Sequence, residues 1–282
     1  MSVFYINGKF VDADKATVPA SDLAVLRGYG VFDFLRTYGG KPFQLGAHLR
    51  RLQRSADLIG LHCPWDIEEM MEVVMETIDR NDYEEANIRI IVTGGDSPDN
   101  FMPQGESRLL VMVTEASRLA PTYYTEGCEI VTMEIDRFIP GAKSINYIPG
   151  IVARRKALEL NPKSIEVIYK SGGIVIEGTT SNTFIYKDGV WVTPANRLLP
   201  GITRAEIIKL MDGVWDCEIR DISEEEYYSA DEVIITASNK EVLPVVKVDD
   251  IIIGSGAVGA QTQKLMDFWK EMTREYARGE VV

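Results

Sequence analysis

Runs with strand-like and helix-like periodicity follow one another in this chain without a regular strand–helix–strand alternation. A doubly wound parallel sheet requires that alternation, because a helix usually joins each parallel strand to the next. Here, groups of strand-like runs are instead followed by helical runs. We therefore expect an α+β fold with mixed or antiparallel sheets and flanking helices.

The N-terminal strands are predicted from their turns. Asn7-Gly8 separates two apolar runs, and Gly39-Gly40 interrupts a second alternating stretch; both dipeptides suit two-residue hairpin turns. After this second turn the apolar period becomes helical, at Leu45, Leu49, Leu52, Ala56 and Ile59. Further along, we expect a second helix over 65–81 and buried strands over 86–95 and 107–116.

A boundary between two domains is predicted near residue 120. Ser117 to Gly127 contains a proline and little periodicity, which is typical of a linker. We expect an N-terminal α+β domain at 1–118, a linker at 119–127 and a C-terminal α+β domain at 128–282. The second domain is predicted to contain strands at 128–138, 164–194 and 230–238, and helices at 151–160, 202–214 and 260–279.

Charge and composition exclude several classes of function. The chain has 43 acidic and 30 basic residues and a net charge of -13, so it would repel nucleic acid and anionic membranes. Three scattered cysteines and two histidines supply neither a disulfide framework nor a zinc site. The N-terminus lacks a signal-peptide pattern, and no apolar run reaches membrane-spanning length. We expect a cytoplasmic enzyme.

Four segments have compositions that do not serve packing. Lys143 lies among small residues, and Glu177 is followed by small hydroxylated residues. Pro200-Gly201 precedes a predicted helix starting near Thr203, where free backbone N–H groups would suit an anion. The fourth segment, 236–241, is a hydroxyl-rich loop directly after a strand. Each alone is also compatible with an ordinary turn, helix cap or surface lysine.

Together and in order, these segments resemble the fold type IV pyridoxal-phosphate enzymes. This family includes D-amino acid transaminases, branched-chain aminotransferases and aminodeoxychorismate lyases. The resemblance covers nearly the whole chain, through RGYGVFDFLRTY, HLRRLQRSA, KSINY, EGTTSNTF, LPGITR and ADEVIITASNKEVLPV. It implies a two-domain fold, pyridoxal 5'-phosphate as cofactor, and a homodimer with active sites near the subunit interface. Thr183 stands where the family prefers an apolar residue.

The resemblance also assigns roles. Lys143 would hold the cofactor as a Schiff base and move the proton, a role that a lowered amine pKa favours. Glu177 would pair with the pyridine nitrogen and keep it cationic. Arg51 would contact the phosphate. The other cofactor contacts implied are Tyr147, Asn182, Leu199, Gly201, Ile202, Thr203, Ser238 and Asn239.

Substrate choice depends on how the α-carboxylate is held. Bacillary D-amino acid transaminases use an Arg-x-His pair, and Asp99 and Phe101 stand at the matching positions here. The branched-chain motifs are also altered, although Arg89 is retained within NIRII. Arg89 on a predicted buried strand would need a partner, either a ligand carboxylate or an acidic side chain distant in sequence. We expect Arg27 and Arg89 to form the carboxylate site. Tyr29 and Arg36 are further substrate candidates, and loops 27–30 and 96–103 should frame the substrate.

These residues favour a D-amino acid transaminase that exchanges amino groups with a 2-oxo acid. A branched-chain L-amino acid aminotransferase is the first alternative. An aminodeoxychorismate lyase, which eliminates pyruvate on the same scaffold, is the second. A catalytically inactive binding protein of this fold would also be acidic and soluble, but the joint retention of Lys143, Glu177 and Arg51 argues against it.

Overall fold

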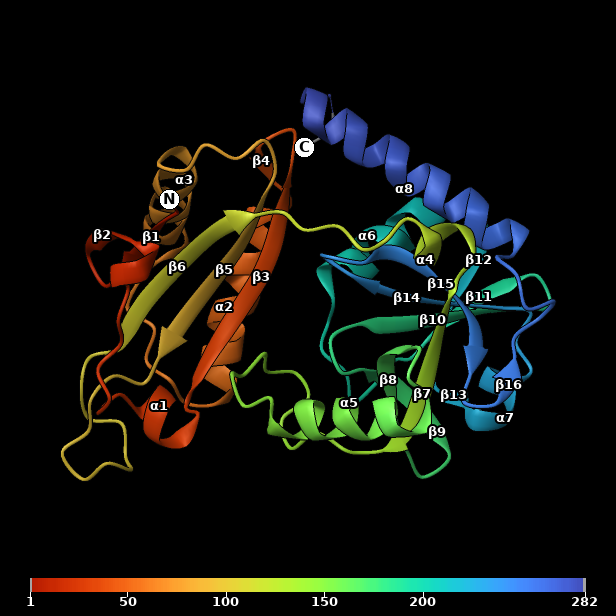
Figure 1. The fold of residues 1–282 in the computed structure, drawn as a ribbon, viewed down its shortest axis with the longest axis horizontal. Helices are drawn as coiled ribbons and strands as arrows, with labels where there is room; N and C mark the ends of the chain where they lie inside the picture. The colour runs from red at the N-terminus through yellow and green to blue at the C-terminus, as the bar shows by residue number, and fades with distance from the viewer. Residues whose placement is uncertain (1, 281–282) are drawn as a thin grey trace. The chain divides into compact units, whose positions relative to one another are not determined.

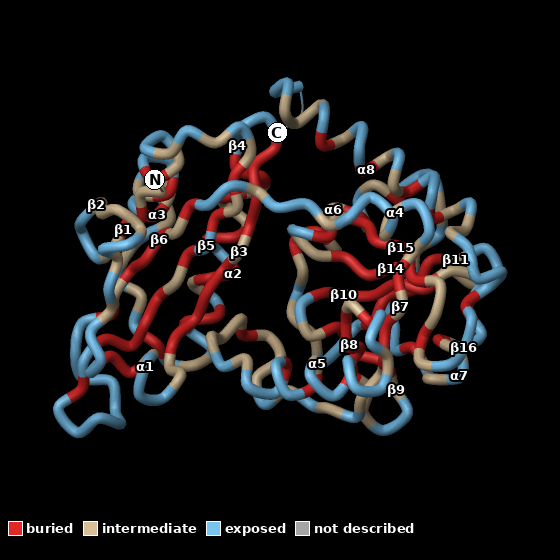
Figure 2. The backbone as a smooth tube through the Cα atoms, viewed as in Figure 1, coloured by how far each residue is buried: buried red, intermediate tan, exposed pale blue. Residues whose placement is uncertain are grey.

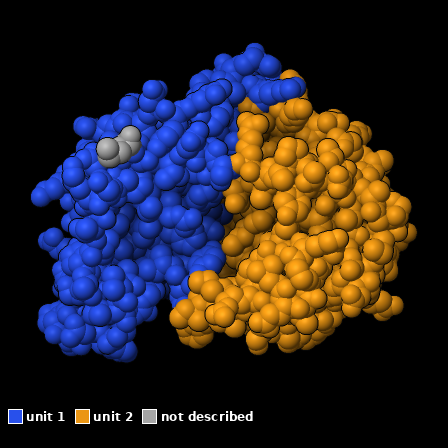
Figure 3. Space-filling model, in the orientation of Figure 1, with its two compact units in different colours: residues 1–117, 141–147, 274–282 blue, residues 118–140, 148–273 orange. Residues whose placement is uncertain are grey.

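The chain forms two compact units in a computed structural model that describes residues 2–280. The first unit comprises 1–117, 141–147 and 274–282, and the second comprises 118–140 and 148–273 (Figure 3). Positions 1, 281 and 282, which the predicted domains include, lie outside the described residues. The predicted α+β class with antiparallel and mixed sheets is confirmed.

The first unit is built on an antiparallel sheet whose strand order, within the described residues, is β2-β1-β6-β5-β3-β4 (Figure 1). The strands are β1 (Val3–Ile6), β2 (Lys9–Asp12), β3 (Gly30–Tyr38), β4 (Lys41–Pro42), β5 (Ala86–Thr93) and β6 (Arg108–Glu115). The helices are the 3-10 turn η1 (Ala13–Lys15), α1 (Leu23–Arg27), α2 (Leu45–Leu58) and α3 (Ile67–Asp79).

Both predicted hairpins are present in this sheet. Asn7 and Gly8 join β1 to β2, with φ angles of 43° and 91°. Gly39 and Gly40 join β3 to β4, with φ angles of 59° and 73°. Positive φ at both central residues is the geometry that matches the right-handed twist of the paired strands.

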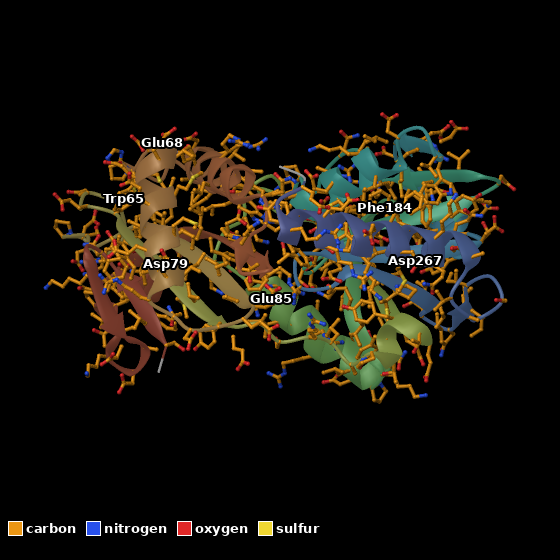
Figure 4. All side chains as sticks on the ribbon, turned by 90° about the horizontal axis from the view of Figure 1, so that it is seen from above. Trp65, Glu68, Asp79, Glu85, Phe184 and Asp267 are labelled. Atoms are coloured by element: carbon orange, nitrogen blue, oxygen red, sulfur yellow. The ribbon has the colours of Figure 1, made fainter. Side chains whose placement is uncertain are left out.

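Helices α2 and α3 pack on one face of this sheet, and the buried residues of both form its core (Figure 2). Leu49 and Leu52 from α2 and Met70 and Val74 from α3 are fully buried there. Glu68 lies near one end of α3 and Asp79 at the other (Figure 4). A capping box at Asp66 satisfies the first N–H groups of α3 and explains why this helix begins at Ile67.

The second unit contains a mixed sheet with strand order β12-β11-β10-β14-β15-β7-β8-β9-β13 among the described residues, and β16 pairs with β15. Its strands are β7 (Cys128–Glu134), β8 (Ser164–Ser171), β9 (Ile174–Gly178), β10 (Asn182–Lys187), β11 (Val190–Thr193), β12 (Asp216–Ile219), β13 (Ile222–Ser223), β14 (Glu232–Ala237), β15 (Glu241–Val248) and β16 (Ile251–Ile252). Its helices are α4 (Thr122–Thr125), α5 (Ile148–Leu160), α6 (Ile202–Met211), α7 (Glu224–Tyr228) and α8 (Ala260–Arg278).

Helix α5 packs on this sheet through its smallest side chains. Ala153 and Ala157 are buried against Val131, Val167 and Tyr169 of β7 and β8. Larger apolar side chains of the same helix are exposed instead, namely Ile148, Ile151, Val152, Leu158 and Leu160. This arrangement reverses the usual amphipathic pattern, in which the large apolar residues face the core.

Two features of the units differ from the predicted domain boundaries. The predicted linker contains the short helix α4 and belongs to the second unit. Lys143, expected in the C-terminal domain, groups with the first unit instead. The reason is a pair of backbone hydrogen bonds to β3, from the Phe32 N–H to the Lys143 carbonyl (2.9 Å) and from the Ile145 N–H to the Gly30 carbonyl (3.0 Å).

The end of α8 also belongs to the first unit, from Arg274 onward. The Tyr276 ring meets the Phe43 ring edge-on, with centroids 5.0 Å apart. The Tyr276 hydroxyl donates to the Pro42 carbonyl (2.8 Å), at the short edge strand β4. Residues distant in sequence therefore complete one packed unit.

Candidate active site

The Lys143 segment is held against the first unit's sheet by its backbone. Its carbonyl accepts the Phe32 N–H, and its N–H donates to the Ser55 Oγ (3.1 Å) on α2. The Lys143 Nζ lies 4.7 Å from the centre of the Phe32 ring, and the Tyr147 ring meets the same phenylalanine edge-on at 5.5 Å. The two backbone hydrogen bonds of Lys143, to Phe32 and Ser55, thus place its side chain over an aromatic ring.

Beneath this segment lies a buried cluster of Asp33, His48 and Arg51. Asp33 on β3 is fully buried and accepts hydrogen bonds from Arg51 through Nε (2.9 Å) and Nη2 (2.7 Å). His48 Nδ1 lies 2.6 Å from the same carboxylate. An ionised carboxylate only accepts, so His48 donates through Nδ1–H and keeps Nε2 as an acceptor.

Burial and charge set the ionisation of this cluster. Burial alone would raise the pKa of Asp33, but the charge and hydrogen bonds of Arg51 and His48 outweigh it and hold the pKa well below its usual range. Burial lowers the pKa of His48, against the opposing effect of Asp33, and the charge of Lys143 adds to the lowering. His48 is therefore neutral near pH 7, and Arg51 is the cation that compensates Asp33.

Asp33, His48 and Ser55 were not among the predicted site residues. The signal was present in α2, where His48, Arg51 and Ser55 follow each other at helical spacing and are all buried beside the apolar stripe. Polar residues on a buried helix face need partners inside the protein. The partners here are Asp33 on β3 and the Lys143 backbone.

Arg89 lies on β5 with its side chain on the sheet face opposite the helices. It is exposed, which corrects the expectation that it is buried and requires an ion-pair partner. Ile88 and Ile90 on either side of it are buried in the core, as the alternation predicts. The Arg89 guanidinium lies 5.0 Å from the ring centre of Phe32 and 5.4 Å from that of Phe34.

Three other candidate substrate residues have contacts of their own in this chain. Arg36 is buried, and its guanidinium lies over the Tyr38 ring at 4.8 Å. Tyr29 donates its hydroxyl to the Ile59 carbonyl (3.2 Å), and burial raises the pKa of this phenol. Arg27 is exposed at the end of α1 and donates to the Leu26 carbonyl (2.8 Å).

Asp99 shapes the loop that was expected to frame the substrate. Its Oδ1 accepts the Ser97 hydroxyl (2.7 Å) and the N–H groups of Phe101 and Met102 (both 2.9 Å). These hydrogen bonds lower the pKa of Asp99, led by the one from Ser97. An anionic side chain committed to its own loop cannot attract a substrate carboxylate, so position 99 does not replace the missing arginine.

In the second unit, the Glu177 carboxylate is buried and held from two directions. Oε1 accepts from Arg137 Nη1 (2.6 Å), and Oε2 accepts the Leu199 N–H (3.0 Å). Asn182 donates to the Leu199 carbonyl (3.0 Å), so both polar groups of the Leu199 backbone are fixed. Arg137 was missed by sequence analysis because it lies 40 residues from Glu177 along the chain.

The start of α6 has the features of a phosphate site. Its N-cap is Gly201, which provides no side chain to accept from the first N–H groups, and Ile202 and Thr203 are buried there. A Cβ added at Gly201 would lie 1.9 Å from the Asn182 Oδ1, so only glycine fits. A helix N-terminus with uncapped N–H groups attracts an anion.

The Thr236 hydroxyl is a second polar group near the start of α6. Thr236 pairs with Asn182 across β10 and β14, so the two side chains lie on the same sheet face. Its Oγ1 is among the few buried side-chain atoms of residues 2–280 that have no hydrogen-bond partner. Ser238 and Asn239, which follow β14, are half-buried and exposed respectively. The Thr236 hydroxyl is thus a buried donor without a partner on the sheet face that it shares with Asn182, the neighbour of Gly201.

Comparison with known proteins decides the family. Residues 30–248 match the family described as Amino-transferase class IV. The chain belongs to the class IV aminotransferases. A D-alanine aminotransferase of Staphylococcus haemolyticus is 34% identical, over 95% of this chain and 96% of that protein. A Methanocaldococcus jannaschii protein named "Putative branched-chain-amino-acid aminotransferase" is 33% identical, over 96% of each chain.

A solved structure agrees with this assignment. The T.th. branched-chain amino acid aminotransferase, determined with pyridoxamine 5'-phosphate, has a TM-score of 0.90 and 27% identity. The alignment covers 97% of this chain and 94% of that one. The predicted aminotransferase activity and the predicted cofactor, pyridoxal 5'-phosphate, are confirmed at the level of the family.

The described residues form neither a metal centre nor a membrane-spanning helix. No group of three or more metal-ligating side chains occurs among residues 2–280. Within the same range, every helix is too short or too polar to cross a membrane. The uncapped α6 start, the free Thr236 hydroxyl and the buried Glu177 carboxylate fit a phosphorylated, nitrogen-containing ring.

The Asp33 cluster predicts how stability depends on pH. Because the folded-state pKa of Asp33 lies below its ordinary value of 3.8, its stabilising contribution is complete above that pH and is lost as the pH falls further. His48, whose pKa is below 6.5, changes stability in the same direction as the pH falls through 6.5. Asp33→Asn should lower the free energy of unfolding at pH 7 by about 3–5 kcal/mol, because Arg51 stays buried without a counterion.

Urea unfolding followed by circular dichroism at pH 7 and pH 3 checks this. Asp12→Asn is the control, since Asp12 pairs with Lys15 at the surface and this variant should change stability far less than Asp33→Asn does. Equal losses for the two variants at pH 7 would contradict the assigned role of Asp33.

Proposed function

We propose that this aminotransferase exchanges amino groups between a D-amino acid, such as D-alanine or D-glutamate, and a 2-oxo acid such as 2-oxoglutarate or pyruvate. One observation carries the proposal. The Lys143 amine and the Arg89 guanidinium both lie over the ring of Phe32, at 4.7 and 5.0 Å from its centre. A single small amino acid can therefore reach the amine with its reacting end and the arginine with a carboxylate.

Lys143 is the residue proposed to hold the cofactor and to move the substrate proton. When bound, pyridoxal 5'-phosphate supplies an electron sink for the carbanion formed at the substrate carbon. In the first half-reaction Lys143 would take the proton from that carbon and deliver it to the cofactor, and in the second half-reaction it would move a proton in the opposite direction. The amino group would be carried on the cofactor between the two substrates, so ping-pong kinetics are expected. The backbone hydrogen bonds to Phe32 and Ser55 fix the lysine while its side chain moves.

The other residues bind and orient the cofactor. Glu177, steadied by Arg137 and the Leu199 N–H, is proposed to face the ring nitrogen. The α6 start at Gly201–Thr203, with Ser238, is proposed to hold the phosphate. Arg51 and Tyr147 are also proposed to contact the cofactor, Leu199 to pack on the ring, and Asn182 and Asn239 to shape the loops.

Arg89 is proposed to bind the substrate carboxylate, with Arg27, Tyr29 and Arg36 as further contacts. Arg89 is exposed and carries no hydrogen bond or ion pair within residues 2–280. Phe32 and Phe34 lie beside its guanidinium, whose nitrogens are available to a ligand. A guanidinium bound in this way can accept a carboxylate with two parallel hydrogen bonds.

A branched-chain L-amino acid aminotransferase is the second candidate. The apolar rings of Phe32 and Phe34 beside Arg89 favour it, since they would suit an aliphatic side chain. The solved structure compared above is an enzyme of that name. Stereochemistry at the substrate carbon distinguishes the two candidates.

Half-reactions of the enzyme with single amino acids separate these candidates. D-Alanine and D-glutamate should convert the absorbance of the internal cofactor to that of the aminated form, and L-leucine should do so at least about 100-fold more slowly. Lys143→Ala should lose the native absorbance band and all turnover. Conversion by L-leucine, L-valine and L-isoleucine alone would replace the D-specific proposal with the branched-chain one. Turnover of a chorismate-derived amine without a 2-oxo acid would instead identify the enzyme as an aminodeoxychorismate lyase.

Replacement of Arg89 tests the carboxylate site. Arg89→Gln should raise KM for the amino acid and for the 2-oxo acid by about 30-fold or more, because a charge-assisted pair is lost. Arg80→Gln is a matched control, since Arg80 also stacks on a phenylalanine, Phe10, at 4.0 Å. Steady-state kinetics of both variants provide the comparison. An unchanged KM in Arg89→Gln would remove Arg89 from the substrate site.

The predicted homodimer is also part of this proposal. The exposed apolar side chains of α5 support it, because Ile151, Leu158 and their neighbours are not covered by other residues of the range 2–280. Ile151→Asp with Leu158→Asp should shift the sedimentation coefficient towards that of a monomer at micromolar concentration. Ile252→Asp, at an exposed position on β16, should leave it unchanged. A monomeric parent chain would contradict the proposal.

The cytoplasmic location stays a prediction.

A further inference from the structure

A second buried carboxylate, Glu166, lies in the second unit and takes no part in the chemistry described above. It stands on β8, only 1% exposed, and its side chain accepts hydrogen bonds from three successive hydroxyl groups. Oε1 accepts from Thr179, and Oε2 accepts from Thr180 (2.7 Å) and Ser181 (3.0 Å). These three residues form the loop that links Glu177 to Asn182.

Lys240 is the cation that balances this carboxylate. Its Nζ lies 3.2 Å from the Glu166 Oε2 and donates to the Thr180 Oγ1 (2.6 Å), which in turn donates to Glu166. Lys240 is 7% exposed, which is unusual for a lysine. Its N–H donates to the Ala237 carbonyl (3.0 Å), so Lys240 also closes the turn that contains Ser238 and Asn239.

The ion pair therefore joins two loops far apart in sequence. One loop, 179–181, lies between Glu177 and Asn182. The other, 238–239, lies between β14 and β15. The two loops adjoin residues proposed to contact opposite ends of the cofactor, the ring nitrogen and the phosphate. A change at either partner of the pair should therefore alter how the two loops are placed.

Glu166 and Lys240 are so deeply buried that their ion pair is not expected to add to the stability of the fold. Moving an ion pair out of water costs free energy that the attraction between the partners only balances. Burial would raise the pKa of Glu166, but the charge of Lys240 and the hydrogen bonds from Thr179 and Thr180 hold it below its usual range. Such a pair is compatible with a role in fixing geometry.

We propose that Lys240 and Glu166 are a positioning pair that fixes the turn at Ser238 relative to the loop at 179–181, so that the Ser238 hydroxyl meets the cofactor phosphate. The inference rests on the proposed contact between Ser238 and that phosphate. The proposed role of Lys240 is to position the turn and not to bind the phosphate, since its ammonium group is directed at Glu166 and Thr180.

The test measures equilibrium binding of two cofactor forms to the apoprotein. Pyridoxal 5'-phosphate and pyridoxal share the ring and the aldehyde but differ in the phosphate. In Lys240→Met, the dissociation constant for pyridoxal 5'-phosphate should rise by about 10-fold or more, while that for pyridoxal changes by less than about 2-fold. Glu166→Gln with Lys240→Met should give the same selective loss, and this double variant leaves no uncompensated buried charge that could prevent folding.

Two further variants make the outcome decisive. Lys170→Met removes a lysine from a more exposed pair with Glu224 in the same unit and should change neither dissociation constant. Ser238→Ala should show the selective loss if the serine contacts the phosphate. A selective loss in Ser238→Ala without one in the double variant would overturn the positioning pair alone. An equal weakening of both cofactor forms in the double variant would assign the pair to general stability and also overturn it. No selective loss in Ser238→Ala would overturn the phosphate contact and this inference with it.

Discussion

The buried contact between Asp33 and Arg51 is the constraint on which the first unit depends. A carboxylate without exposure must have its charge balanced within the protein, and Arg51 does this through two of its nitrogens. The contact fixes the rotation of α2 against β3. That rotation in turn places Ser55 under the Lys143 N–H, so the position of the lysine proposed to hold the cofactor follows from a charge pair one turn of helix away.

The second unit uses the same physical device. Glu166 is a buried strand carboxylate, its cation is Lys240, and its remaining acceptors are filled by neighbouring hydroxyl groups. In both units the carboxylate organises polar segments that packing alone would leave loose. The groups proposed to perform chemistry, Lys143 and Glu177, then need only short backbone or side-chain contacts to reach their positions.

The sequence predicted the elements that local patterns determine. Asn7-Gly8 and Gly39-Gly40 predicted their hairpins, and the apolar stripe of α2 predicted its buried face. The α+β class, the family and the cofactor are confirmed because several ordered motifs agree. The pairing of Glu177 with Arg137 and of Asp33 with His48 could not be predicted, because each joins residues distant along the chain. The exposure of Arg89 was also missed. The alternation of side chains along a strand shows that Arg89 and its isoleucine neighbours lie on opposite faces of the sheet, but it does not show whether helices cover both faces.

The contact between Tyr276 and β4 has a consequence for synthesis on the ribosome. Most of the first unit is made before the second unit, but Tyr276, whose ring packs on Phe43 and whose hydroxyl donates to the Pro42 carbonyl, is made after residues 118–273. During translation, this edge of the sheet stays uncovered until the second unit has been synthesised. An uncovered edge can pair with another chain, so the final turn of α8 acts as a late cover that ends this exposure.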